Sequence, residues 1–176
     1  MLQKSCILLL LTSLLLTLVP TTAAQGGCMT GPSLNNPYSN DIYTVQVYND
    51  RIYVGGWFHF RQQYDNGDWG SFGGGITGNG GYTLVDTLTV YEGELIAGGA
   101  FFTAGGISVN NIAAWDDTAF KALGSGFNNE VNALQVWNGR LVAGGTFTAS
   151  GDGTQSLSRI ALWDGREWSP LGEGVS

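Results

Sequence analysis

Alternating apolar and polar positions recur three times along the chain, each time as a pair of short runs. The stretches 41–58, 84–101 and 130–147 align without gaps, and we call them the starts of copies one, two and three. Their runs are short, rich in aliphatic and aromatic residues, and free of helix start signals, so they predict β-strands. Each stretch is therefore expected to form two strands joined by a turn.

Two turn residues separate the runs of each copy, at 49–50, 92–93 and 138–139. Asn138-Gly139 is a strong hairpin signal, because a tight primed turn needs positive φ at both central residues. Each second run ends on two glycines, which allow close backbone packing or a bulge at that point. The glycine pairs are Gly55-Gly56, Gly98-Gly99 and Gly144-Gly145.

A second shared pattern follows each hairpin: an aromatic–Asp pair, a second aromatic residue, and a Gly-x-Gly ending. We expect Asp164 to bond its own turn backbone, since Asp164-Gly165 has the composition of a second hairpin turn. The stretch before the aromatic–Asp pair differs in length between copies, as a surface loop tolerates. It is shortest in copy one, which is predicted to lack a loop and part of a strand. The pattern comprises Tyr64-Asp65 and Trp69, Trp115-Asp116 and Phe120, and Trp163-Asp164 and Trp168.

The repeat period indicates the architecture. Successive glycine pairs lie 43 and 46 residues apart, and four short strands per ~45 residues is the content of one β-propeller blade. We predict an all-β chain of three four-stranded blades, with the first shortened, that forms an incomplete propeller. The blades are residues 41–80, 81–129 and 130–176. A β-solenoid is the main alternative, and the hairpin turns argue against it.

The first 24 residues are typical of a signal peptide. Lys4 gives a short positive start, residues 7–19 are almost wholly apolar, and small residues precede Gln25. This pattern predicts cleavage before Gln25 and export to the cell exterior or surface, with no membrane span afterwards. An uncleaved anchor is the alternative. Residues 25–40, rich in Gly, Pro, Ser and Asn, are expected to be a leader or linker.

Charge and cysteine content limit the classes of molecule that the chain is expected to bind. The chain carries 7 basic and 14 acidic residues, a net charge of −7, and its basic residues are scattered singly. Binding to nucleic acid is therefore not expected. Signal cleavage leaves Cys28 as the only cysteine, so it either pairs with another chain or a missing part of this one, or stays a free thiol in the leader.

The repeat consensus resembles a known family of sequences. The pattern V-x-A-L-x-V-x-x-G-x-L-x-x-G-G-x-F, followed by I-A-x-W-D-G-x-x-W-x-x-L-G-x-G, is similar to the repeats of secreted Kelch-like β-propellers. These occur in the fungal cortical polarity-marker family and in bacterial cell-surface proteins. Copy three, 131–174, matches it nearly throughout, copy two well and copy one partly. The resemblance implies an extracellular or surface-attached propeller, and it does not specify a ligand.

Few residues suggest chemistry. His59 is the only histidine, so a catalytic triad or a His/Cys metal site is not expected, and we predict no metal or cofactor. Asp152 faintly resembles a calcium loop, but turn chemistry is the favoured interpretation. Trp57 has no aromatic counterpart in the other copies, and with His59 and Tyr64 it is the candidate binding contact. Recurring residues are assigned structural roles: Gly55, Gly56, Gly98, Gly99, Gly144, Gly145, Asp116, Asp164, Trp115, Trp163 and Trp168.

The resulting functional hypothesis is a secreted, non-enzymatic propeller module that binds an extracellular protein or glycan. The alternative is the N-terminal part of a propeller enzyme, carbohydrate-active or galactose-oxidase-like, with its active residues beyond residue 176. Three blades would leave two open edges. We therefore expect either a fragment of a longer propeller or a homodimer that completes a six-bladed ring.

Overall fold

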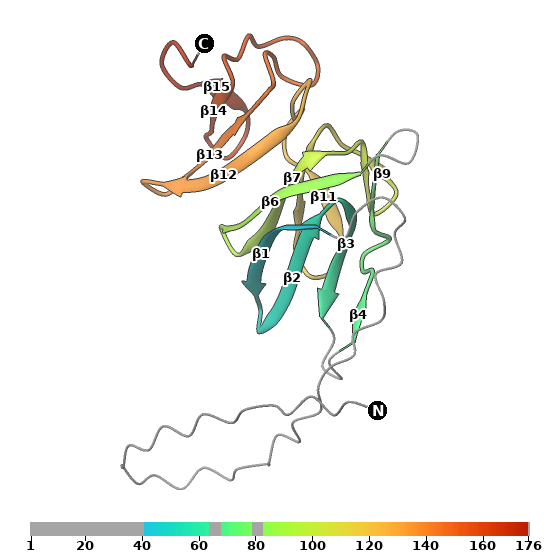
Figure 1. Ribbon diagram of the computed structural model, residues 1–176. Coiled ribbons are helices and arrows are strands. Elements are labelled where there is room, and N and C mark those ends of the chain that lie inside the picture. The colour runs from blue at the N-terminus through green and yellow to red at the C-terminus, as the bar shows by residue number, and fades with distance from the viewer. Residues whose placement is uncertain (1–40, 64–67, 79–82, 176) are drawn as a thin grey trace, which may run out of the picture.

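The computed structural model describes residues 41–63, 68–78 and 83–175 (Figure 1). Every regular element in these ranges is a β-strand, so the all-β prediction is confirmed. The predicted signal peptide, the leader with Cys28, and the Tyr64-Asp65 pair lie outside the described residues.

Each sequence copy forms one antiparallel four-stranded sheet, in which the strands lie side by side in chain order. Sheet 1 contains β1 (Ile42–Tyr48), β2 (Arg51–Gly56), β3 (Phe58–Gln63) and β4 (Trp69–Gly70). Sheet 2 contains β6 (Leu84–Tyr91), β7 (Glu94–Ala100), β10 (Ile112–Trp115) and β11 (Phe120–Ala122). Sheet 3 contains β12 (Val131–Trp137), β13 (Arg140–Gly145), β14 (Ile160–Trp163) and β15 (Trp168–Pro170).

The shortening of copy one falls on a connection and leaves the strand count intact. Trp57 alone joins β2 to β3, and sheet 1 still has four strands. Gln63 pairs with Trp69, as Trp115 pairs with Phe120. The sheet register therefore places Gln63, one residue before Tyr64, at the position of Trp115.

The first hairpin of each sheet has positive φ at both central turn residues, as predicted for Asn138-Gly139. Asn138 and Gly139 have φ of 49° and 73°, and Glu92 and Gly93 have 50° and 80°. Asn49 and Asp50 adopt 46° and 59° without any glycine, which Asn and Asp tolerate better than other residues. These turns fix the register of each first strand pair.

Each first strand also carries a bulge at the same place. The pairing shifts between Ile42 and Thr44, between Val85 and Thr87, and between Val131 and Ala133. The bulge lies opposite the glycine pair at the end of the second strand, where a side chain at Gly99 or Gly145 would collide with backbone of the first strand. The bulged residues are Tyr43, Asp86 and Asn132.

The first strands of neighbouring sheets lie against one another (Figure 1). The backbone N–H of Leu88 donates to Oγ1 of Thr44 at 3.1 Å, and the N–H of Leu134 donates to Oγ1 of Thr87 at 3.1 Å. Thr44 and Thr87 occupy equivalent positions after the bulge. The same hydrogen bond therefore joins sheet 1 to sheet 2 and sheet 2 to sheet 3.

The hydrophobic core lies between the sheets and not within any one of them. Leu95 and Ala97 of β7 face a cluster shared with sheet 1, whereas Ile96, between them, faces a cluster shared with sheet 3. Trp168 spans the second junction, where its Nε1–H donates to the carbonyl of Leu123 at 3.0 Å. The first cluster includes Tyr48, Tyr53, Ile76, Val85, Leu88 and Trp115, and the second includes Tyr91, Phe127, Val131, Leu134, Leu141 and Phe147.

The longer connection of copies two and three was predicted to be a surface loop. Most of its residues are exposed, but it is also a hairpin that pairs with the preceding repeat. In copy two it forms a hairpin of β8 (Thr103–Ala104) and β9 (Ile107–Ser108), which pairs with β5 (Ile76–Thr77) after sheet 1. In copy three Ser150 pairs with Phe127 in the same way. The hairpin therefore ties each sheet to the end of the preceding repeat.

Candidate functional site

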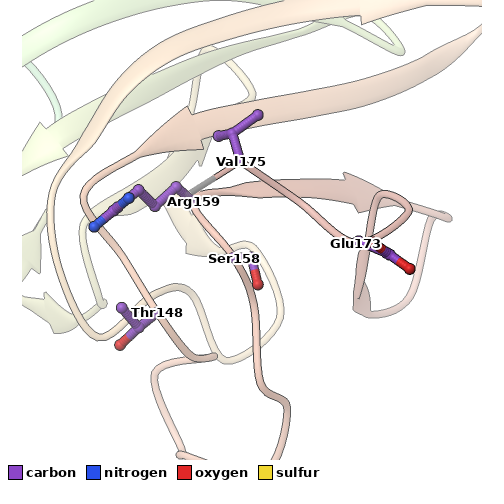
Figure 2. Close-up of a pocket in the computed structure, with 5 residues that line it drawn as sticks. All are labelled: Thr148, Ser158, Arg159, Glu173 and Val175. Atoms are coloured by element: carbon purple, nitrogen blue, oxygen red, sulfur yellow. The ribbon is translucent and has the colours of Figure 1, made fainter.

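A cavity of about 340 Å³ opens on sheet 3 (Figure 2). Thr148 follows β13, Ser158 and Arg159 precede β14, and Glu173 and Val175 follow β15. Figure 2 shows Thr148 and Arg159 on one side, Glu173 on the other, and Ser158 between them. Three segments that are distant in sequence therefore supply the lining.

Part of the cavity is open because Arg159 stands where sheet 2 has Asn111, whose side chain fills the equivalent position. Asn111 and Arg159 share a left-handed backbone, with φ of 63° and 64°, and the N–H of each donates to the carbonyl of its own Phe101 or Phe147. The Asn111 side chain is buried, accepts from the N–H of Phe101 at 3.2 Å, and donates to the carbonyl of Phe127 at 3.0 Å. Arginine cannot make this compact bridge, and the Arg159 side chain is exposed.

Val175 leaves another part of the cavity unfilled. Its N–H donates to the carbonyl of Ser158 at 3.0 Å, as the N–H of Phe127 donates to the carbonyl of Asn110 at 3.0 Å, so the two residues are equivalent. Phe127 is 1% exposed, because sheet 3 covers it, whereas Val175 is 56% exposed. The cavity thus lies where the corresponding part of sheet 2 is packed.

The lining favours binding by hydrogen bonds and charge. Arg159 supplies a guanidinium, Glu173 a carboxylate, and Thr148 and Ser158 hydroxyl groups. Neither Arg159 nor Glu173 forms an ion pair with another residue of the described ranges. A ligand that carries hydroxyl and carboxylate groups would find both donors and acceptors here.

A second polar cluster lies between sheets 2 and 3. Asp86, at the bulge of β6, accepts a hydrogen bond from Nδ2 of Asn132 at 3.4 Å. Burial, together with the charge of neighbouring Glu130 and a hydrogen bond with it, raises the pKa of Asp86 to about 6. The Asp86 carboxyl therefore takes up a proton under mildly acidic conditions. Sequence reasoning did not single out Asp86, although it is the one acidic residue among the three bulge positions.

The recurring turn aspartates are occupied by their own turns. Oδ1 of Asp164 accepts from the N–H groups of Arg166 and Glu167, each at 2.8 Å, and Asp116 accepts from Thr118 and Ala119 in the same way. These hydrogen bonds lower the pKa of Asp116 and that of Asp164.

Asp152 is held in the same manner. Its Oδ1 accepts from the hydroxyl of Ser150 at 2.6 Å and from the N–H of Thr154 at 3.1 Å, which lower its pKa to about 2. The interpretation of turn chemistry, in preference to a calcium loop, agrees with this geometry.

Of the three candidate binding residues, the structure describes the side chain of Trp57 alone. Trp57 is half-buried between β2 and β3, and its N–H donates to the carbonyl of Asp41 at 3.3 Å. His59 lies on β3, and its side chain is outside the described part of the chain, as is Tyr64. A contact formed by these three residues stays a prediction.

No protein-family model matches the chain, and no curated protein matches it either. Within residues 41–63, 68–78 and 83–175, no helix is long and apolar enough to cross a membrane. In the same ranges, no group of three or more His, Cys, Asp or Glu side chains is placed to hold a metal ion. The geometry of the site is therefore the basis for inferring function.

Proposed function

We propose that the chain is a secreted, non-catalytic β-propeller module that binds an extracellular protein or glycan through the cavity of sheet 3. Three antiparallel four-stranded sheets with their first strands side by side support the propeller assignment, since blades are arranged radially in this way. The signal-peptide pattern of residues 1–24 supports secretion.

The binding proposal rests on the left-handed backbone and exposed side chain of Arg159. A left-handed backbone costs about 1–2 kcal/mol for a residue other than Gly, and Asn and Asp tolerate it best. Asn111 meets this demand in sheet 2 and closes its own repeat with two hydrogen bonds. Arg159 adopts the same strained backbone but cannot make the two side-chain hydrogen bonds of Asn111. Strained backbone of this kind concentrates at functional sites. Its exposed guanidinium is suited to a ligand carboxylate.

The substitution Arg159→Asn tests this proposal on the secreted product of the full chain. Wild-type protein is first screened on arrays of acidic and neutral glycans and of acidic peptides, and the strongest ligand is then titrated. We expect Arg159→Asn to weaken binding at least tenfold, since a charged hydrogen-bonding partner contributes about 1.5–3 kcal/mol. The variant should also unfold at higher temperature, because an asparagine at this position could repeat the hydrogen bonds of Asn111.

Arg166→Ala is the matched control, because Arg166 is an exposed arginine of the Asp164 turn that does not line the cavity. It should leave affinity unchanged. Equal affinity of wild type and Arg159→Asn would place binding elsewhere and overturn the cavity assignment. The paired readout matters, because loss of binding together with higher stability cannot result from misfolding.

A further inference from the structure

The two junctions inside the chain follow one design. Val85 of sheet 2 packs on Gly55 of sheet 1, where a Cβ would lie 2.5 Å from its Cγ1. Val131 of sheet 3 packs on Gly98 of sheet 2, where the corresponding distance is 2.7 Å. Both valines are fully buried. Each junction thus places a branched side chain of the later sheet on a bare glycine of the earlier one.

Sheet 1 exposes an apolar surface that its counterparts bury. We call it the leading face: Ile42, Val45, Val47 and Ile52. Ile42 is 53% exposed, whereas its counterparts Val85 and Val131 are 0% exposed. Val45 is 59% exposed, against 7% for Leu88 and 8% for Leu134. In sheets 2 and 3 the preceding sheet covers these positions.

Sheet 3 exposes the complementary surface, the trailing face: Ala133, Trp137 and Gly144. A Cβ at Gly144 would meet nothing closer than 3.9 Å, so the glycine that accepts a branched side chain at the other junctions is open. Trp137 is 55% exposed, whereas the equivalent Tyr48 and Tyr91 are 5% and 7% exposed under the next sheet. Ala133 stands where Thr44 and Thr87 accept an inter-sheet hydrogen bond.

From these two faces we infer that a second copy of this chain docks head to tail, its leading face on the trailing face of the first. Ile42 of the second copy takes the place on Gly144 that Val131 takes on Gly98, and Ile52 and Val45 cover Trp137. The leading face corresponds to the surfaces of sheets 2 and 3 that pack on the preceding sheet, and the trailing face corresponds to the surfaces of sheets 1 and 2 on which they pack. A second copy of the chain can therefore repeat the junction that occurs twice within one chain. Such a heterologous contact closes into a ring of two copies, or extends if the rotation does not close.

The docked copy would approach Val175, since Phe147 and Trp168 cover its counterpart Phe127 within the chain, but it leaves the part of the cavity at Glu173 uncovered. Within the chain, the hairpin of the later sheet covers this region: Gly151 presses on Ser125, the counterpart of Glu173. Sheet 1 has no such hairpin, since Trp57 alone joins β2 to β3. Ligand binding and docking are therefore tested with different variants: Arg159→Asn changes the cavity, whereas Gly144→Val and Ile42→Asp change the docking faces.

Sedimentation velocity of the secreted full chain, across concentrations from ~1 to ~100 µM, tests the docking. Wild type should show a species of twice the chain mass. Gly144→Val should be monomeric yet folded by circular dichroism, because its own repeat leaves room for the side chain. Ile42→Asp should also be monomeric, and Ile107→Asp, at an exposed position of β9, should behave as wild type.

Two further measurements establish the polarity of the contact. A mixture of the Gly144→Val and Ile42→Asp monomers should recover a two-chain species, since one variant keeps the leading face and the other the trailing face. Ala133→Thr should tighten association about fivefold by restoring the hydroxyl acceptor of the internal junctions. A monomeric wild type, a Gly144→Val protein that still dimerises, or a mixture that stays monomeric would overturn the inference.

Discussion

Asp86 occupies the bulge of β6, where sheet 1 carries Tyr43 and sheet 3 carries Asn132. Its carboxyl faces Glu130, a residue of the next repeat, so two like charges meet at a junction between sheets. The sequence could not predict this approach, because the two residues lie in different copies and neither belongs to the shared pattern. By contrast, the turn role of Asp164 was predictable, since it depends only on the residues beside it.

Asp86→Asn should therefore stabilise the protein at neutral pH. Its pKa is raised on folding from 3.8 to about 6, so its stabilising contribution is present below pH ~4 and lost as the pH rises through 6. The full shift is worth about 3 kcal/mol, and solvent screening of this half-buried group reduces the expected gain to about 1–2 kcal/mol at pH 7.5. Urea unfolding at pH 4.5, 6 and 7.5 measures it.

Asp50→Asn is the control for that experiment, because Asp50 is an exposed turn residue with left-handed backbone that Asn also tolerates. Because it is a surface substitution, we expect it to change the free energy of unfolding by less than about 0.5 kcal/mol at each pH between 4.5 and 7.5. If Asp86→Asn and wild type ran parallel over this interval, Asp86 would not titrate there.

At the scale of elements, the period-two pattern and the turn residues were enough to predict the hairpins. The prediction worked because those signals are local: Asn138-Gly139 sets its own backbone and with it the pairing of β12 with β13. No comparable signal marks β5, β8 and β9, which have two residues each and pair across repeats. Strands this short have no periodicity to detect.

Gly98 lies under a side chain of the next sheet, whereas the equivalent Gly144 is not covered, so substitutions at the two positions can be compared. Gly98→Ala should destabilise by about 1–3 kcal/mol, since the new Cβ lies 2.7 Å from Val131 Cγ1 and 3.0 Å from Thr87 Cγ2. Gly144→Ala should be neutral or stabilising by up to about 1 kcal/mol, because its Cβ meets nothing closer than 3.9 Å and the change restricts the unfolded chain.

Urea unfolding at ~1 µM chain or below, with both variants in parallel, makes this comparison free of association. Neither glycine has positive φ, so backbone strain does not enter. Equal losses in the two variants would mean that the glycine pair is needed for the hairpin itself and not for the packing of one sheet on the next.

At the scale of the molecule, the sequence predicted the three four-stranded sheets, but it predicted neither the three-stranded sheet of β5, β8 and β9 nor where the core lies. Apolar residues alternate on both sides of β7, and only the structure shows that one side belongs to the junction with sheet 1 and the other to the junction with sheet 3. A sheet buried on both sides depends on both neighbours, as expected for repeats whose stability resides largely in nearest-neighbour contacts. The middle sheet should therefore be the last to unfold.

Phe127→Ala tests this dependence at the second junction. Phe127 ends copy two but stacks on Phe147 of sheet 3, with ring centroids 4.1 Å apart, and lies 4.6 Å from the ring of Trp168. Its removal leaves a cavity that should cost about 3–5 kcal/mol. Because the lost packing lies at the junction between sheets 2 and 3, sheet 3 should unfold first. Calorimetry should resolve this early transition, accompanied by a change in tryptophan fluorescence from sheet 3, while sheets 1 and 2 unfold later.

Phe102→Ala is the control, at a 42% exposed position of the same repeat, and it should shift the unfolding temperature only slightly. A single, undivided transition in Phe127→Ala would show that the three sheets unfold as one cooperative unit.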